Sequence, residues 1–385
     1  GIDTVAEIFV NGARLGRSAN MVIPHRFDLD ASRLKADGNE LVVRIQSSAN
    51  AARNFRVPPG SMATCDYNVE GLFLRRPMHT YGWDIAPRLV GAGLWRQAYL
   101  EIVKPERWTD LYLTTTSATP KVGQMMFRWS FASDSKALMG YEGRLTLECR
   151  GHQVEKRFAI VFTSGGFSFE VPRPHLWFPR GSGEPDLYNV RLDLLHDGEI
   201  VDTRTWRTGI RTVELRRSEL LDAERKGEFV FIVNRRKVFI KGSNWVPANA
   251  IHGESAERVR KNLDLFIDLG CNMVRSWGGS VYEDEAFFDY CDEHGLLVWQ
   301  DFMFACELPP QNEDFLARVR EEAEVIVCRL RNHPSLAVWS GDNECDGAYF
   351  YPPFNRYPTS SNRVTRDILP RVVFQFDPNR DYLPS

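Results

Sequence analysis

The chain of 385 residues lacks the features that mark several common classes of protein. Its seven cysteines show no C-x-x-C spacing, and their odd number argues against a complete disulfide framework. We therefore expect reduced thiols, which favour the cytoplasm over a periplasmic or secreted location. The eight histidines show no H-E-x-x-H or other paired metal spacing, so the sequence predicts neither a metal nor another cofactor.

Membrane and nucleic-acid binding also find no support in the composition. The longest apolar runs are far shorter than the roughly 20 residues that a membrane-spanning helix needs. Lys and Arg total 48 against 51 Asp and Glu, and this net charge of -3 provides no electrostatic basis for binding nucleic acid. No serine nucleophile elbow, phosphate loop or dinucleotide fingerprint is present. The composition agrees with a protein that binds a neutral ligand. Its ten Trp and 24 Phe supply side chains for the core and for stacking on a ligand.

The first half of the chain is rich in short β patterns. Residues 3–103 alternate such runs with turns, including a hairpin signal at Asn11-Gly12. Residues 108–215 form a second set, with loops expected at Gly165-Gly166 and at Gly181–Gly183. A further hairpin is predicted from Phe229–Val233 and Lys237–Ile240, around Asn234–Arg236.

The second half alternates strands with helices, which predicts a parallel sheet. One helix is expected between an N-cap at Ser255 and Gly270, a second over 283–294 before Gly295, and a third over 316–330 before Pro334. A doubly wound sheet and a (β/α)8 barrel both fit this order. Polar residues directly after the strands, together with the missing glycine-rich fingerprint, favour the barrel. The predicted strands are Val238–Ile240, Met273–Arg275, Leu296–Trp299 and Leu336–Trp339.

The pair Asn343-Glu344 follows the last of these apolar strands. A carboxyl group at the carboxyl end of a barrel strand can protonate a departing sugar oxygen, and the adjacent amide can bind a ring hydroxyl. We expect Glu344 to face a sugar pocket at the barrel mouth, with apolar walls such as Trp339 raising its proton affinity.

Several stretches of the sequence resemble β-mannosidases of glycoside hydrolase family 2. The segments 242–247, 275–283, 299–304 and 332–344 resemble the first four barrel strands, and Tyr81–Asp84 and Gly93–Arg96 resemble the sugar-binding domain. The resemblance implies a retaining exo-glycosidase made of a jelly-roll-like β-sandwich (1–104), an immunoglobulin-like β-sandwich (105–215) and the first half of a (β/α)8 TIM barrel (216–385). It also implies a carbohydrate partner, a β-mannoside or manno-oligosaccharide.

The same resemblance assigns roles to individual residues. Glu344 would be the general acid/base, and Asn343 would bind the hydroxyl next to the reacting carbon. Arg275 would orient the nucleophile, Trp277 would stack on the sugar, and Asp301 would either support a ligand hydroxyl or pair with Arg275. A loop carrying Trp83 and Asp84 would close the pocket around the terminal sugar. Trp95 and Arg96 are expected to serve packing and a salt bridge between domains.

Length limits these expectations, because a complete barrel takes about 250 residues. The sequence has room for half a barrel, ending with a helix over 362–376 and a fifth strand near Arg380–Pro384. In the resembling family the nucleophile is a Glu on the seventh strand, and no Glu follows Glu344 here. We therefore expect an internal piece of a longer enzyme, inactive by itself.

Two other classes of function stay open at this point. One is a different family 2 exo-glycosidase, such as a β-galactosidase, β-glucuronidase or exo-glucosaminidase. The other is a noncatalytic carbohydrate-binding protein, which two β domains could form. The Gly82–Asp84 loop favours a mannoside, and the setting of Glu344 favours an enzyme.

Overall fold

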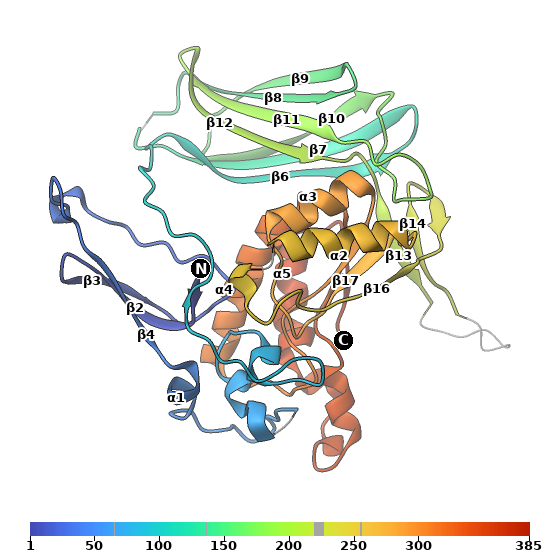
Figure 1. Ribbon diagram of the computed structural model, residues 1–385. Helices are drawn as coiled ribbons and strands as arrows, with labels where there is room; N and C mark the ends of the chain where they lie inside the picture. Colours follow the sequence, from blue (N-terminus) through green and yellow to red (C-terminus); the bar gives the residue numbers. More distant parts are fainter. Residues whose placement is uncertain (65, 136, 219–226, 255) are drawn as a thin grey trace.

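The computed structural model describes residues 1–64, 66–135, 137–218, 227–254 and 256–385. Figure 1 shows a β-sandwich at the top, an α/β unit in the middle and a smaller, mainly β unit at the lower left. The N-cap expected at Ser255 lies outside the described residues. None of the helices in the described part of the chain is both long and apolar enough to cross a membrane.

The N-terminal unit is built on a three-stranded antiparallel sheet with the order β3-β2-β4. The hairpin predicted at Asn11-Gly12 is confirmed, because both residues have positive φ and join β2 to β3. Residues 47–64 and 66–92, where further short strands were expected, form short helices and turns. Buried side chains of this segment form a small core of their own, made of Ala51, Ala52, Leu72, Phe73 and Leu74. The elements are β1 (Ile2–Asp3), β2 (Val5–Val10), β3 (Ala13–Ser18), η1 (Ala31–Arg33), β4 (Leu41–Gln46), α1 (Ser48–Ala52), η2 (Asp66–Leu72), η3 (Met78–Tyr81) and β5 (Gly93–Leu94).

The second unit is an immunoglobulin-like sandwich of two antiparallel sheets, with orders β10-β7-β6 and β12-β11-β8-β9. Side chains alternate between buried and partly exposed along β8, as a strand with one face on a core requires. The loop predicted at Gly165-Gly166 is wrong, because both glycines lie inside β10. The strands are β6 (Arg107–Ala118), β7 (Val122–Ala132), β8 (Tyr141–Cys149), β9 (His152–Ala159), β10 (Ser164–Pro172), β11 (Tyr188–His196) and β12 (Glu199–Thr208).

A small antiparallel sheet links the sandwich to the α/β unit. It has the order β13-β14-β15, from β13 (Val213–Arg217), β14 (Phe229–Val233) and β15 (Arg236–Val238). The predicted hairpin is confirmed, with positive φ at Asn234 and Arg235 in its turn. The parallel strand predicted at Val238–Ile240 is wrong, because Val238 ends β15 and the parallel sheet begins at Gly242. The apolar side chains of β14 and β15 instead pack under the parallel sheet, against Met273 and Leu297.

The third unit is the first part of a (β/α)8 barrel. Its five parallel strands have the order β16-β17-β18-β19-β20, and a helix lies between each strand and the next. The predicted helix stops at Gly270 and Gly295 are confirmed, each with φ near 70°. The elements are β16 (Gly242–Trp245), η4 (His252–Glu254), α2 (Ala256–Asp268), β17 (Met273–Ser276), α3 (Glu285–His294), β18 (Leu297–Asp301), α4 (Glu313–Leu330), β19 (Leu336–Ser340), η5 (Cys345–Phe350), η6 (Phe354–Arg356), η7 (Thr359–Ser361), η8 (Val364–Ile368), α5 (Leu369–Phe376) and β20 (Asp381–Leu383).

The main core of this unit lies between the sheet and its helices. Leu263 of α2, Phe287 of α3 and Ile326 of α4 pack there with outward-facing residues of the strands. Trp339 belongs to this helix-side core, where it is fully buried and its indole N–H donates to Asp377 at 3.0 Å. From the sequence we expected Trp339 to line the pocket of Glu344. This expectation is wrong, because the Trp339 side chain lies on the helix side of the sheet.

Candidate active site

Four parallel strands bring polar side chains together around the guanidinium of Arg275. Arg275 lies on β17 and donates to Asp301 of β18, through Nη2 to Oδ2 at 2.7 Å and through Nε to Oδ1 at 3.3 Å. It also donates to Asn343 Oδ1 beyond β19 at 3.0 Å and to Asn244 Oδ1 of β16 at 3.4 Å. Because carboxyl ends of parallel strands share one edge, these residues form one polar cluster at the barrel mouth.

Asp301 is the counter-ion of this cluster. Besides Arg275 it accepts the backbone N–H of Gly278 at 3.1 Å and the indole N–H of Trp299 at 3.0 Å. The side chain is fully buried, and burial raises its pKa to about 6 against the opposing effect of Arg275. Of the two roles considered for Asp301, the geometry displays the pairing with Arg275.

Asn343 and Glu344 follow β19 in a turn, and Glu344 adopts a left-handed conformation with φ 62°. Asn343 is buried, whereas Glu344 is exposed. The thiol of Cys306 donates to Glu344 Oε2 and accepts from the amide of Asn343, both at 3.4 Å. Glu344 is thus linked to Arg275 through Cys306 and Asn343. Among the described residues the five strands pair in the order β16-β17-β18-β19-β20, with β16 and β20 at the edges of the sheet.

Asp342 immediately precedes the pair Asn343-Glu344. Its side chain is buried and accepts from the Ser385 hydroxyl at 2.5 Å and from the Cys345 N–H at 3.1 Å. Burial raises its pKa to about 7, so it is partly protonated near neutral pH. Its charge near the candidate acid is correspondingly reduced.

The N-terminal unit reaches the same mouth with the loop that carries Trp83 and Asp84. Trp83 lies edge-on to Trp277, which follows β17, with ring centroids 5.4 Å apart. His79 joins the Trp83 loop to the segment after Trp277, because its backbone N–H and its Nδ1 both lie within 3.3 Å of the Gly279 carbonyl oxygen. The backbone pairs Trp83 with Ala86 in a tight turn, which leaves Asp84 exposed at the tip. Trp277 itself is 6% exposed.

Trp95 and Arg96 connect the units away from this mouth. The Trp95 indole donates to the Met21 carbonyl at 3.1 Å, and Arg96 stacks on the Trp95 ring. Arg96 reaches the barrel unit at the Tyr282 carbonyl, 2.8 Å away. The expected salt bridge is therefore wrong, because the acceptor is a backbone carbonyl rather than a carboxylate.

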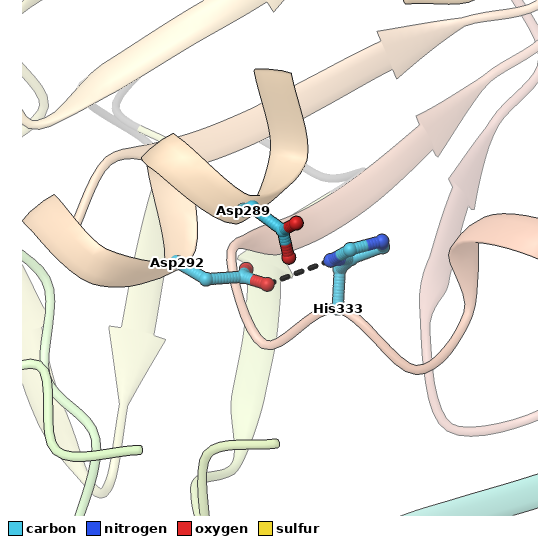
Figure 2. Close-up of side chains that lie close together, drawn as sticks. All are labelled: Asp289, Asp292 and His333. Carbon is cyan, nitrogen blue, oxygen red and sulfur yellow. Dashed lines mark hydrogen bonds and ion pairs between the residues drawn. The ribbon is translucent and has the colours of Figure 1, made fainter. Parts of the chain in front are cut away.

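Figure 2 shows a second cluster of ionisable groups, formed by two aspartates of α3 and a histidine in the turn before β19. Asp289, Asp292 and His333 bring their polar atoms within 4.8 Å of one another. His333 Nδ1 lies 2.6 Å from Asp292, and Nε2 lies 3.0 Å from Glu285. Burial opposes the charge of this imidazole, but the two carboxylates raise its pKa to about 9. His333 and Arg207, which pairs with Asp289 at 3.4 Å, are cations of this cluster, which we interpret as structural.

Sequence reasoning missed Cys306. Its thiol lies between Asn343 and Glu344, but its spacing to the other cysteines follows no motif. The acids that follow Glu344 have other partners or positions. Asp346 pairs with Arg366 and Asp367 with Arg371. Asp377 accepts from the Trp339 indole, and Asp381 begins β20 at the opposite end of the sheet.

Comparison with known protein families identifies the family of this chain. Three models of family 2 glycosyl hydrolase domains match the chain: the galactose-binding domain-like model at residues 1–96, the model named for the family at 109–211, and the TIM barrel domain at 225–362. These matches occupy most of the chain, in the order that the three structural units have. The chain belongs to glycosyl hydrolase family 2.

The chain is also similar to individual proteins of this family. The chain is 32% identical to beta-mannosidase B of Aspergillus clavatus, covering 100% of this chain and 47% of the relative. It is 36% identical to beta-mannosidase B of Thermothelomyces thermophilus, covering 89% and 40%. The crystal structure of beta-D-mannosidase from Dictyoglomus thermophilum superposes with a TM-score of 0.89 at 34% identity, covering 100% of this chain and 48% of that one. The chain thus spans about half the length of these relatives.

Proposed function

We propose that this chain is part of a retaining exo-glycosidase that hydrolyses terminal, nonreducing β-D-mannosides. The proposal rests above all on the Arg275 cluster, which joins Asn343, beside Glu344, to the mouth of the parallel strands. The choice of a β-mannoside as substrate is supported by the names of the relatives and by the contact of Trp83 with Trp277, which places the Trp83 loop at the mouth.

In this mechanism Glu344 is the general acid and then the general base. It protonates the departing glycosidic oxygen, and after the glycosyl-enzyme forms it removes a proton from the attacking water. Asn343 donates to the hydroxyl next to the reacting carbon, and this hydrogen bond strengthens as positive charge develops on the sugar ring. Trp83, which is half-buried against Trp277, offers ring surface to the sugar, and Asp84 accepts from its distal hydroxyls.

A retaining reaction needs a second carboxyl group about 5–5.5 Å from the first. The later acids of this chain are engaged elsewhere, and the relatives are about twice as long. We therefore propose that the nucleophile is a Glu supplied by a part of the protein outside the given sequence, oriented by Arg275. The 385 residues alone are then expected to be inactive.

The test uses the longer protein and its Glu344→Gln variant on aryl glycosides. We expect release from the β-mannoside to exceed release from the β-galactoside, β-glucuronide and β-glucosaminide. Because general acid–base catalysis contributes about 10²–10⁴-fold, Glu344→Gln should lower kcat/KM by that factor. Glu257→Gln, an exposed carboxylate on α2, is the matched control and should keep parental activity. Full turnover in Glu344→Gln would exclude Glu344 as the general acid. Faster release from the β-galactoside or the β-glucuronide would exclude the β-mannoside as the preferred substrate.

A further inference from the structure

The loop after β18 and the turn after β19 are fixed to each other through their backbones. The Cys306 N–H donates to the Asn343 carbonyl at 2.7 Å, and the Asn343 N–H donates to the Phe304 carbonyl at 2.9 Å. Ala305 and Asn343 are paired as in a parallel ladder. This pairing places the Cys306 side chain directly beside those of Asn343 and Glu344.

The thiol forms two contacts there. It donates to Glu344 Oε2 and accepts from Asn343 Nδ2, both at 3.4 Å, a distance suited to sulfur. Asn343 in turn accepts from Arg275. The guanidinium, the amide, the thiol and the carboxylate therefore form one continuous chain of hydrogen bonds, with Glu344 at its end.

The N-terminal unit fixes the loop of Cys306 from the other side. The Thr64 hydroxyl donates to the Cys306 carbonyl at 3.0 Å. Met62 and Leu308 exchange backbone hydrogen bonds of 3.0 and 2.8 Å, and their side chains pack with Tyr349 beyond Glu344. The position of the thiol thus depends on contacts from two structural units, rather than on the loop alone.

We propose that Cys306 is a positioning residue for Glu344: its S–H holds Oε2 of the carboxylate and leaves Oε1 free to exchange the proton with the leaving group. This inference deepens the proposed function and rests on it. The thiol, not the thiolate, is required for this role.

The surroundings keep the thiol protonated. Burial and the adjacent Glu344 raise the pKa of Cys306 to about 12, Asp342 adds to this effect, and the hydrogen bond from Asn343 opposes it. At neutral pH the group is therefore a donor and a poor nucleophile. Its role is distinct from that of a reactive cysteine.

The contact can be tested in the longer protein by the rate of iodoacetamide alkylation, resolved for each cysteine by peptide mass spectrometry. Glu344→Gln removes the negative charge beside the thiol, so the alkylation rate of Cys306 at pH 8 should rise about tenfold, one unit in pKa. Cys328 is the internal control, because its half-buried thiol lies on α4 and its rate should not change. An unchanged Cys306 rate would overturn the proposal, whatever the activity of the enzyme.

The positioning role is tested in the longer, active protein. Cys306→Ala removes the donor, so kcat should fall about tenfold while KM stays near the parental value, because only the placement of the carboxylate for proton transfer is lost. Cys306→Ser keeps a donor at this position and should restore kcat. A rise in KM without a loss of kcat, or a Ser variant that behaves like Ala, would overturn the role. Full activity of Glu344→Gln would instead refute the proposed function, while the alkylation result would still report the contact.

Discussion

At the scale of single residues, Glu307 is a buried acid close to the candidate site. Among the described residues its Oε2 has no hydrogen-bond partner. Burial raises its pKa from 4.5 to about 8, against the opposing charge of Arg75. The folded state therefore holds a proton that the unfolded chain releases. The stability from this group is complete below pH 4.5 and is lost as the pH rises to about 8.

Glu307→Gln should remove this loss, because the amide resembles a protonated carboxyl in shape and has no charge. We expect the free energy of unfolding at pH 8 to exceed that of the parent by roughly 2–4 kcal/mol, and to match the parent near pH 4. Urea unfolding at the two pH values measures the difference. Glu257→Gln, on the surface, should show no such pH dependence. A variant less stable than the parent at pH 8 would contradict the assignment.

At the scale of elements, β10 depends on a glycine that the sequence did not place in a strand. Gly165 faces Trp129 of β7 in register, and a Cβ there would lie 2.4 Å from its ring. We expect Gly165→Ala to displace the ring and lower the stability of the β6-β7-β10 sheet by about 1–3 kcal/mol. Faster hydrogen exchange of β7 and β10 would report this. Gly93→Ala, in β5 with no atom within 4 Å, is the control.

The same strand shows what sequence patterns could and could not predict. Gly-Gly pairs usually mark loops, and Gly165 lies in a strand because the whole of β10 pairs in register with β7, whose position the local sequence does not reveal. Strands β17, β18 and β19 and helices α3 and α4 were predictable, because their apolar periodicity and caps are local signals. The first parallel strand was misplaced because β16 is short and polar, whereas the apolar run before it belongs to the hairpin sheet.

The candidate site was partly predictable for a related reason. Arg275, Asp301 and Asn343 directly follow or end apolar strands, and parallel strands bring such ends together. Cys306 and the segment Met62–Thr64 carry no local sequence signal, because they lie some 240 residues apart in the sequence and meet only in the folded structure. The position of Trp339 was predicted wrongly because its neighbours in the sequence do not reveal which face of β19 it occupies.

At the scale of the whole molecule, a buried ion pair holds the N-terminal unit on the barrel unit. Arg75 forms two hydrogen bonds with Glu322 of α4, both at 2.8 Å, and donates to the Met303 carbonyl. Glu322 also accepts from Asn20 and Tyr282. The two charged side chains are 4% and 2% exposed, so neither could be hydrated if its partner were removed.

Glu322→Ala should therefore cost about 3–5 kcal/mol, because it leaves the Arg75 charge buried without a counter-ion. The loss should appear as faster hydrogen exchange and proteolysis in residues 73–90, which carry Trp83 to the mouth. Replacing both partners by apolar residues, as in Arg75→Met with Glu322→Leu, should recover part of the loss because no charge then remains buried. Glu257→Ala breaks an exposed pair with Lys261 and should cost no more than about 1 kcal/mol. If Glu322→Ala and Glu257→Ala were equally mild, contacts other than this ion pair would have to hold the N-terminal loop at the barrel mouth.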